Sequence, residues 1–342
     1  MQASLVYRGA DLSFLPEIES AGTTFYNANN QVTDALTIMK QGGMNLVRLR
    51  LWYTPGGIHS GLTEVTNFAQ RIKMAGLSWL LDFHYSDTWA DPGTQTMPAA
   101  WQSLTYAVLL DSVYGYTFRV MNDLKTRGIL PAIVQLGNET NSGMLWNIGR
   151  VGGSFDINWP QFAGLIKKGA EAVKNIDPTI KIMIHYAGTN GAPGFFSNVQ
   201  TQGVNYDIMG ISYYPWWHNR DLTGLQTDLN SLATNYNKDI LIAETAYPFT
   251  LAWNDNTNNI VGASTPLLPA YTATQDGQLK FLTDLRTTIH NIPGNHGLGM
   301  CYWAPDWVAY RGTSATNGSS WENLALFDFS NKALPALAAF AQ

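Results

Sequence analysis

Short apolar segments alternate along this chain with longer stretches of helical periodicity. Segments rich in Val, Ile, Leu and aromatic residues predict eight strands, which begin near Leu5, Leu46, Leu77, Ala132, Lys181, Tyr206, Asp239 and Gly297. Between them, the pattern predicts helices over residues 32–41, 62–75, 108–127, 159–175, 222–236 and 274–290. Because successive strands are joined by helices, we expect a parallel sheet with crossover connections.

Eight such units in one uninterrupted chain predict the α/β fold class and a single (β/α)8 TIM barrel. We expect one catalytic domain over residues 1–342, with the barrel proper at about residues 5–340. An open doubly wound sheet is the alternative, but no Gly-x-Gly-x-x-Gly follows the first strand, so its usual ligand signature is missing. Stretches rich in Gly, Asn, Ser and Thr at 253–269 and 310–323 are expected to form long loops at the active face.

Composition narrows the class of ligand. Only 13% of the 342 residues are charged, 12% are aromatic, and the formal net charge is −5. Such a surface is typical of secreted proteins that handle neutral polymers. It offers no concentrated cationic patch, so nucleic acid is not expected as a partner. Cys301 is the only cysteine, which excludes an intrachain disulfide.

The sequence also bears on location. No apolar run reaches the ~20 residues that a membrane span needs. The start, Met1-Gln2-Ala3-Ser4, has neither the basic nor the apolar region of an export signal. A cytoplasmic protein and a protein whose leader was removed both fit this start. We expect that a leader was removed, with a lipoprotein anchor left open. A surface suited to a neutral polymer separately favours a secreted or cell-envelope protein.

Two of the expected strands end in a glutamate. The apolar run at 133–136 is followed by Gly137-Asn138-Glu139, and the run at 240–243 is followed by Glu244. The carboxyl ends of barrel strands carry the chemistry of this architecture, so both carboxylates are expected at the active face. Cleavage of a glycosidic bond needs such a pair. One carboxyl protonates the leaving oxygen, and the other meets the positive charge that develops at the anomeric carbon.

Arginines on the second strand suggest how the two glutamates divide the work. In Val47-Arg48-Leu49-Arg50-Leu51, the alternation places Arg48 and Arg50 on one face. A structural ion pair beneath the barrel is one interpretation. The other is that this cationic face keeps Glu244 ionised as a nucleophile. An apolar, Trp-rich rim around Glu139 would favour its protonated form and the role of acid.

Polar and aromatic residues end other strands as well. A metal site on the histidine and aspartates after the third strand is one interpretation, but the six histidines are scattered and no His-x-His pair occurs. The aspartates after the third strand could instead have a structural role and hold a rigid loop. The histidine on the fifth strand could likewise be a hydrogen-bonded core residue. We expect His84 and Asp87 to bind sugar hydroxyls and Trp89 to stack on a sugar ring. We expect further residues that support the site or bind substrate at His185, Tyr213, Tyr214, Trp303 and Trp307.

These residues carry a resemblance to a known family. Asn138-Glu139 and Glu244 resemble the clan A retaining glycoside hydrolases. Finer motifs resemble the endo-β-1,4-galactanases of glycoside hydrolase family 53, over almost the whole chain from about Leu5 to Phe340. These motifs are Tyr7-Arg8-Gly9-Ala10-Asp11, Val47-Arg48-Leu49-Arg50-Leu51-Trp52, Asp87-Thr88-Trp89-Ala90-Asp91-Pro92, Leu136-Gly137-Asn138-Glu139 and Tyr302-Trp303-Ala304-Pro305.

The resemblance implies a (β/α)8 barrel that cleaves the β-1,4-galactan (type I arabinogalactan) side chains of pectin with retention, by double displacement. It makes Glu139 the acid/base and Glu244 the nucleophile. Asn138 would bind the 2-hydroxyl of the sugar at the cleavage site, and Arg48 would support Glu244. A cis peptide bond is implied between Trp303 and Ala304. No cofactor is expected for catalysis, and we expect a monomer.

Bacterial members of the family bind calcium in the loop after the seventh strand. The resemblance therefore implies a structural calcium on Asp255 and Asn259, with Ser319 or Glu322 as further ligands. Trp253 and Thr257 stand where stronger ligands would be expected. Two other functions stay open at this point. One is a clan A endo-glycosidase acting on mannan, glucan or type II galactan, and the other is a catalytically inactive carbohydrate-binding barrel.

Overall fold

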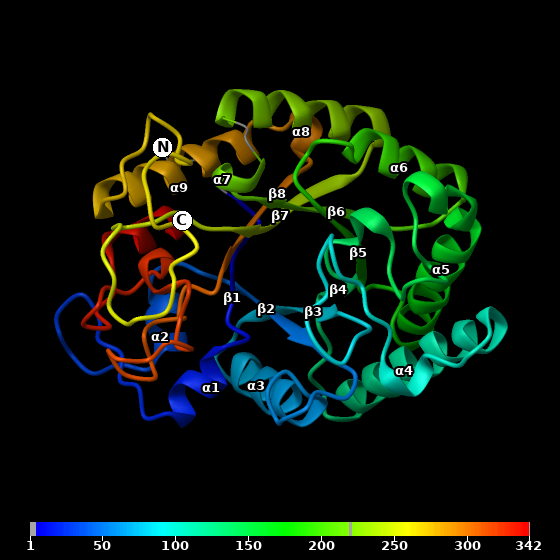
Figure 1. Ribbon diagram of the computed structural model, residues 1–342, viewed down its shortest axis with the longest axis horizontal. Helices are drawn as coiled ribbons and strands as arrows, with labels where there is room; N and C mark the ends of the chain where they lie inside the picture. Colours follow the sequence, from blue (N-terminus) through cyan, green and yellow to red (C-terminus); the bar gives the residue numbers. More distant parts are fainter. Residues whose placement is uncertain (1–4, 219–220, 342) are drawn as a thin grey trace. The chain divides into compact units, whose positions relative to one another are not determined.

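The computed structural model describes residues 5–218 and 221–341. The chain start 1–4, on which the expectation of a removed leader rests, lies outside these residues. Within them, eight parallel strands follow one another in sequence order and close into a barrel (Figure 1). They are β1 (Tyr7–Asp11), β2 (Leu46–Leu51), β3 (Ser78–Phe83), β4 (Ile133–Leu136), β5 (Lys181–Ala187), β6 (Ile208–Tyr213), β7 (Asp239–Thr245) and β8 (Gly297–Trp303). The predicted (β/α)8 fold is confirmed.

Helices connect the strands on the outside of the sheet. The α-helices are α1 (Leu15–Ser20), α2 (Ala35–Gln41), α3 (Leu62–Met74), α4 (Tyr106–Thr126), α5 (Trp159–Ile176), α6 (Ala192–Thr201), α7 (Pro215–His218), α8 (Leu222–Tyr236) and α9 (Gln275–His290). Short 3-10 helices are η1 (Ala99–Trp101), η2 (Thr140–Ser142), η3 (Gly153–Asn158), η4 (Pro293–Asn295), η5 (Glu322–Leu324) and η6 (Pro335–Phe340). No helix of the described residues is both long and apolar enough to cross a membrane.

The sequence pattern missed α1, α6 and α7. Two of them are only six and four residues long, and α6 begins at a Gly and Pro cluster that is typical of loops. Pro193 nevertheless lies in the first turn of α6. A helix tolerates proline there because the first backbone N–H groups have no partner within the helix.

The chain divides into two compact units, of which the first comprises residues 1–48 and 213–342. Here β1 pairs with β8, from Tyr7 opposite Gly299 to Asp11 opposite Trp303. Gly9 faces Cys301 in this register, and a Cβ on Gly9 would lie 2.6 Å from the Cys301 Sγ. Only glycine therefore allows the two strands to pair over the fully buried cysteine.

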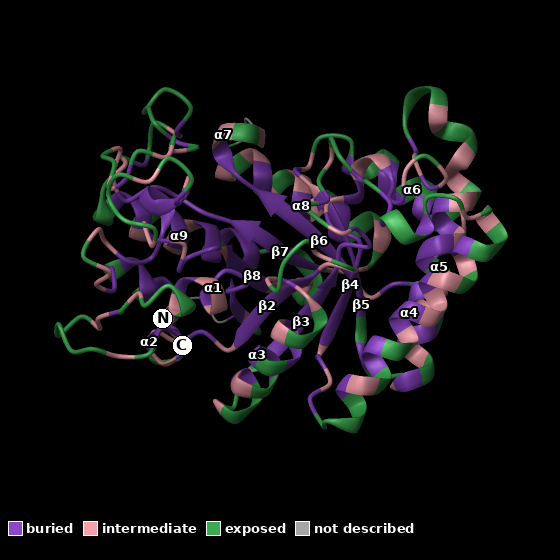
Figure 2. Ribbon diagram, turned by 60° about the horizontal axis from the view of Figure 1, so that its bottom comes forward, coloured by how far each residue is buried: buried purple, intermediate pink, exposed green. Residues whose placement is uncertain are grey.

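The second unit comprises residues 49–212. It contains β3 paired with β4, β4 with β5, and β5 with β6, where Ala187 lies opposite Ser212. The strands are buried, and α4 and α5 pack side by side along them with polar faces outward (Figure 2). Apolar strand residues pack against these helices. The polar residues that follow the strands lie at the carboxyl ends of the strands, where a site can form.

Candidate active site

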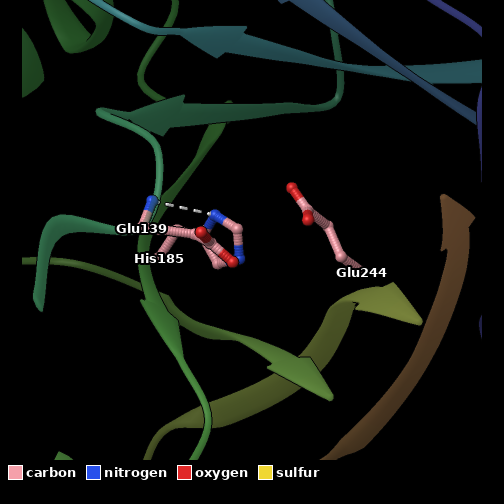
Figure 3. A group of neighbouring side chains, drawn as sticks. All are labelled: Glu139, His185 and Glu244. Atoms are coloured by element: carbon pink, nitrogen blue, oxygen red, sulfur yellow. Dashed lines mark hydrogen bonds between the residues drawn. The ribbon is translucent and has the colours of Figure 1, made fainter. Parts of the chain in front are cut away.

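Glu139 lies just after β4, where the chain makes a tight turn. Gly137 has a φ of 85° and Glu139 a φ of 44°, so both adopt the left-handed conformation. For a residue with a Cβ this conformation costs roughly 1 kcal/mol or more and persists only where neighbours hold it. One such neighbour is His185, whose Nδ1 accepts the backbone N–H of Glu139 at 3.2 Å (Figure 3). The turn thus directs the Glu139 side chain away from the strand core.

The carboxylate of Glu139 is bound by a serine from β6. Ser212 donates its hydroxyl to Glu139 Oε1 at 2.6 Å, and the same hydroxyl lies 2.8 Å from His185 Nε2. His185 and Ser212 are fully buried, whereas Glu139 is partly exposed. Both ring nitrogens of His185 are therefore engaged by protein groups, and one oxygen of the Glu139 carboxyl is held by Ser212.

Asn138 is held by the backbone of a neighbouring loop. Its Nδ2 donates to the Ala90 carbonyl at 2.8 Å, and its Oδ1 accepts from Gln135 Nε2 at 3.1 Å. Gln135, fully buried on β4, also lies 3.0 Å from His185 Nδ1. The amide of Asn138 is thus fixed in orientation before any ligand arrives.

Glu244 lies near the end of β7 (Figure 3). It is only 6% exposed. Arg48 of β2 contacts Glu244 Oε1 at 2.9 Å and Asp11 Oδ2 at 2.7 Å through the same Nη1 atom. Tyr214 donates its hydroxyl to Glu244 Oε2 at 3.0 Å. A buried carboxylate with a cation on one oxygen and a hydroxyl donor on the other is stabilised in its ionised form.

Cys301 lies on β8 within the electrostatic field of these groups. Burial raises the pKa of its thiol to about 12, and the carboxylates of Asp11 and Glu244 act in the same direction, against Arg48. The thiol therefore stays protonated at any physiological pH. Cys301 fills space beside Gly9 and supplies no nucleophile.

The residues after β3 form a loop-holding network. The ring of His84 accepts at Nδ1 from Trp52 Nε1 and contacts Asp82 Oδ2 at 3.0 Å through Nε2. Asp87 accepts the backbone N–H groups of Thr54 and Ala99 on its two oxygens. Sequence reasoning expected both side chains to bind sugar hydroxyls. The structure places them in support of the loop, because their polar atoms already bind protein groups.

Trp89 and Arg50 form a stacked pair beside that loop. The Arg50 guanidinium lies 4.3 Å from the centroid of the Trp89 ring and 5.2 Å from that of Trp52. Its Nε donates to Ser60 Oγ at 2.8 Å. Trp89 is 38% exposed, which suits a stacking platform. Arg48 and Arg50 thus act separately, Arg48 on Glu244 and Arg50 beneath Trp89.

Strand alternation separates Tyr213 from Tyr214. Tyr214 points to Glu244, whereas Tyr213 is 1% exposed and stacks on Phe281 of α9. Burial raises the pKa of Tyr213 far above its ordinary value. The structure therefore does not place Tyr213 with the other predicted site residues, because Tyr213 ends β6 and the side chain of Tyr214, the next residue, points to the opposite face.

An aromatic wall lies beside Glu244 in the first unit. We use this name for a cluster of aromatic rings in which each ring contacts at least one other member. Its members are Phe14, Tyr214, Trp216, Trp217, Trp303, Trp307 and Trp321. Trp217 is 55% exposed, so the wall is open to solvent at that point. His218 Nδ1 accepts the Tyr214 backbone N–H at 3.0 Å, and burial lowers the pKa of His218 to about 4.

The prediction of a cis peptide bond between Trp303 and Ala304 is wrong. Among the described residues, the cis bond lies between Trp146 and Asn147. At the end of β8 the chain turns through Ala304, which has a φ of 50°, and the Ala304 N–H donates to the Asp11 carbonyl at 3.2 Å. A left-handed residue tied to β1 therefore makes the turn after β8.

Sequence reasoning assigned no role to four residues that the structure places at the site. Asp11 shares Arg48, Gln135 and Ser212 bind His185, and Trp321 donates to the Trp303 carbonyl at 3.1 Å. For Ser212 a signal was present, because it alternates with Tyr214 at the end of a strand. Gln135 gave a weaker signal, as a polar residue within an otherwise apolar strand.

The predicted calcium ligands lie in two loops that bind one another. Asp255 accepts the backbone N–H groups of Thr257 and Ser319, and Glu322 Oε1 accepts those of Asn254 and Asp255. Glu322 Oε2 and Asn259 Oδ1 are buried without a hydrogen-bond partner among the residues that the structure describes. Burial, and after it the neighbouring Asp255 carboxylate, raise the pKa of Glu322. Oxygen atoms without donors beside two carboxylates fit a hard cation.

Comparisons with known proteins agree with this architecture. The sequence model of glycosyl hydrolase family 53 matches residues 7–340. An uncharacterized protein of Niallia circulans is 43% identical over 97% of this chain and 92% of its own length. An arabinogalactan endo-beta-1,4-galactanase of Cellvibrio japonicus is 37% identical over 98% of this chain and 90% of its own length.

A solved structure gives the same result. The family 53 catalytic domain of Ignisphaera aggregans superposes with a TM-score of 0.92 at 38% identity, covering 98% of this chain and 95% of that one. The family model matches nearly the whole sequence, and these relatives share more than a third of their residues with this chain. An unrelated barrel that only resembles this fold is therefore excluded. The chain belongs to glycosyl hydrolase family 53.

Proposed function

We propose that this protein is a retaining endo-β-1,4-galactanase that hydrolyses galactan, the type I arabinogalactan side chains of pectin. The proposal is supported by the family, by the galactanase named among the relatives and, above all, by one observation. The glutamates that end β4 and β7 have different environments. Glu244 binds a buried cation and a tyrosine hydroxyl, whereas Glu139 binds a neutral serine and is partly exposed.

Glu244 is proposed as the nucleophile. A nucleophilic carboxylate must be ionised when substrate binds, and the contacts with Arg48 and Tyr214 stabilise that form. Asp11 keeps Arg48 in place from the other side. During attack, Glu244 loses charge to the new bond with the anomeric carbon.

Glu139 is proposed as the acid/base. It gives a proton to the leaving oxygen in the first step and takes one from water in the second. Its Oε1 accepts a hydrogen bond from the neutral hydroxyl of Ser212, in contrast to the guanidinium that binds Glu244. Asn138, fixed by Gln135 and Ala90, is proposed to bind the sugar 2-hydroxyl.

Retention requires the two carboxyls to flank the scissile bond at about 5 Å, without room for a water molecule between sugar and nucleophile. We propose this arrangement for Glu139 and Glu244, which end strands of one closed barrel. Proton NMR of the first product detects it: the new reducing end should be the β-anomer before mutarotation. Initial release of the α-anomer would contradict retention and leave the family assignment untouched.

The central experiment replaces each glutamate by glutamine. Glu139→Gln and Glu244→Gln should each lower the turnover of unbranched β-1,4-galactan by several orders of magnitude, about 10³-fold or more. Glu171, exposed on α5 and paired with Lys168 at 2.8 Å, provides a matched control. Glu171→Gln makes the same chemical change and should leave turnover intact. Near-normal activity in either active-site variant, with unchanged circular dichroism, would overturn the proposal.

Substrate choice is tested with a panel of polymers. Hydrolysis should be fastest on β-1,4-galactan, with oligosaccharide products that show internal cleavage. Preference for mannan, glucan or type II galactan would keep the mechanism and change the substrate. Binding without release of reducing ends would identify a carbohydrate-binding barrel instead. The aromatic wall supports the sugar chain in each case, because sugar rings stack on exposed indoles such as that of Trp217.

We further propose a structural calcium, with no part in the chemistry, on Asp255, Asn259 and Glu322. The buried oxygens of Glu322 and Asn259 that have no donor support this assignment. A cation there would join the loops after β7 and β8. Millimolar calcium should then raise the thermal midpoint of the chelator-treated protein, and Glu322→Gln should remove that response. A midpoint unaffected by calcium would show that the hydrogen bonds of Asp255 and Glu322 suffice.

The remaining proposals concern the protein as a whole. The match over residues 7–340 supports one catalytic domain. A neutral polymer as substrate supports action outside the cytoplasm, by a protein that is secreted or attached to the cell envelope. We also propose a monomer. Size-exclusion chromatography with light scattering tests the monomer, and fractionation of the source cells tests the location.

A further inference from the structure

The chain that follows the proposed acid/base doubles back over residues 143–150, a segment that we call the β4 hairpin. Gly143 lies opposite Arg150 in an antiparallel bridge. Within the turn, the Met144 N–H donates to the Gly149 carbonyl at 3.1 Å. This backbone pairing fixes the point at which the side chain of Arg150 leaves the hairpin.

The β4 hairpin is tied to the backbone of the acid/base. Gln95 donates from Nε2 to the Asn138 carbonyl at 2.7 Å and to the Glu139 carbonyl at 3.3 Å. The carbonyl of Gln95 accepts the Trp146 N–H at 2.9 Å. Gln95 is only 2% exposed, so water does not compete strongly for these bonds. The hairpin therefore has a fixed place beside the backbone of Glu139.

Arg150 contacts two aromatic rings. Its guanidinium carbon lies 4.1 Å from the centroid of the Trp146 ring and 4.3 Å from that of the Phe155 ring. All three side chains are half-buried. A cation–π contact holds a guanidinium in place, but it neutralises no charge. The rings therefore position a cation that still reaches solvent.

The guanidinium of Arg150 has no anionic partner among residues 5–218 and 221–341. No hydrogen bond or ion pair joins its N–H groups to another side chain or carbonyl of these residues. Asp156, the acidic residue nearest in the chain after it, instead accepts from the Gly152 N–H at 3.1 Å and from Trp159 Nε1 at 3.3 Å. The charge and the donors of Arg150 are thus available to a ligand.

We infer that Arg150 binds the carboxylate of a uronic acid residue on the leaving-group side of the cleavage site. The inference rests on the proposed function, in which Glu139 protonates the leaving oxygen. The leaving part of a cleaved polysaccharide is its reducing-end part, and the β4 hairpin lies beside the acid that serves it. Galactan side chains of pectin are attached at their reducing ends to a backbone rich in galacturonic acid. Carboxylates therefore lie on that side of the bond.

The chemistry of the two groups matches. A guanidinium presents parallel N–H donors that bind both oxygens of a carboxylate, whereas a neutral sugar offers only hydroxyl groups without charge. Arg150 is held before substrate arrives, so little side-chain freedom is lost on binding. The same contact is made with the bound substrate and with the transition state, and should therefore lower KM more than it raises kcat.

Rhamnogalacturonan fragments with short β-1,4-galactan side chains test the inference. One sample keeps its galacturonic acid carboxylates, and in the other they are chemically reduced to alcohols. The ratio of kcat/KM on the first sample to kcat/KM on the second should be about 3 to 10 for the unaltered protein. In Arg150→Gln the ratio should fall to about 1. Because both values come from one enzyme, a general loss of activity in the variant cancels.

Arg127→Gln is the matched control. Arg127 is an exposed arginine at the end of α4 that pairs with Asp123 at 2.8 Å, and its loss changes the net charge by the same amount. Its ratio should equal that of the unaltered protein. An equal fall in both variants would show that net charge, and not a contact with Arg150, favours the acidic sample.

A second measurement needs no variant. The Debye length is about 30 Å at 0.01 M salt and about 3 Å at 1 M, so an ion pair at the surface weakens as salt is added. In the unaltered protein, the ratio should therefore decline toward 1 between these concentrations, and the KM on the acidic sample should carry the change. A ratio that stays constant would exclude a charged contact.

The outcomes separate this inference from the proposed function. A ratio near 1 in the unaltered protein, or one that persists in Arg150→Gln, would overturn the role of Arg150. Hydrolysis of both samples would still support a galactanase. If the unaltered protein hydrolysed neither sample nor unbranched β-1,4-galactan, the proposed function itself would be overturned.

Discussion

Removal of the Tyr214 hydroxyl perturbs the nucleophile without creating a cavity. In Tyr214→Phe, Glu244 Oε2 loses the donor that lies 3.0 Å away, and Arg48 remains on Oε1. A hydrogen bond to a charged group contributes about 1.5–3 kcal/mol, and one pKa unit corresponds to about 1.4 kcal/mol. The ionised form of Glu244 is therefore destabilised by the equivalent of about 1–2 pKa units.

The sign of the effect follows from the charge. A nucleophile that is harder to ionise becomes protonated at a higher pH, so the acid limb of the kcat/KM profile should move up by about 1–2 units. Above that limb, activity should largely persist because Arg48 still binds the carboxylate. The profile is measured on galactan by the release of reducing ends across the acid range.

Tyr213→Phe is the matched control. It removes the same atom from the neighbouring residue of the chain, whose ring packs on Phe281 and away from Glu244. Its acid limb should coincide with that of the unaltered enzyme. The reasoning would be refuted if Tyr214→Phe left the limb in place, or if both variants moved it equally.

Three further predictions concern groups whose ionisation is changed by burial or by a buried partner. Arg48→Met leaves the Asp11 and Glu244 carboxylates buried without their cation, so the free energy of unfolding in urea should fall by about 3–5 kcal/mol and activity should be lost. The Cys301 thiol, with a pKa raised to about 12 by burial, should not react with a disulfide reagent at pH 8 until the protein is denatured, when one thiol should appear. His218 has a pKa of about 4 in the folded protein and about 6.5 in the unfolded chain. Between pH 4 and 6.5, the histidine is therefore protonated in the unfolded chain and neutral in the folded protein. Stability should therefore fall as the pH drops from about 6.5 to 4, by up to about 3 kcal/mol, and His218→Gln should flatten that part of the urea-denaturation profile. An acid-side profile that is the same with and without His218 would contradict its assignment as a partly buried, neutral group.

The fold and both glutamates could be predicted because each leaves a local mark on the sequence. A strand of a closed barrel is a short apolar run, and Glu139 and Glu244 interrupt such runs at one end. The arginine on Glu244 was also within reach, because strand alternation assigns Arg48 and Arg50 to one face. What alternation could not show is that Arg50 would be bound by Ser60 and Trp89.

Other features depend on contacts between distant segments. His84 and Asp87 have the composition of a sugar-binding site, but Trp52, Thr54 and Ala99 already occupy their polar atoms. Tyr213 and Tyr214 are identical in type, and only the register of β6 decides which one meets Glu244. Register is a property of strand pairing, and the sequence of one strand does not contain it.

Closure of the sheet has a consequence for how the chain folds. β1 completes its hydrogen bonds only when it pairs with β8, which is made almost last. Contacts so far apart in the chain carry a large loop-closure entropy and form slowly. Until β8 arrives, β1 presents an open edge to other chains. A nascent or truncated chain that ends before residue 297 should therefore depend on chaperones to avoid aggregation.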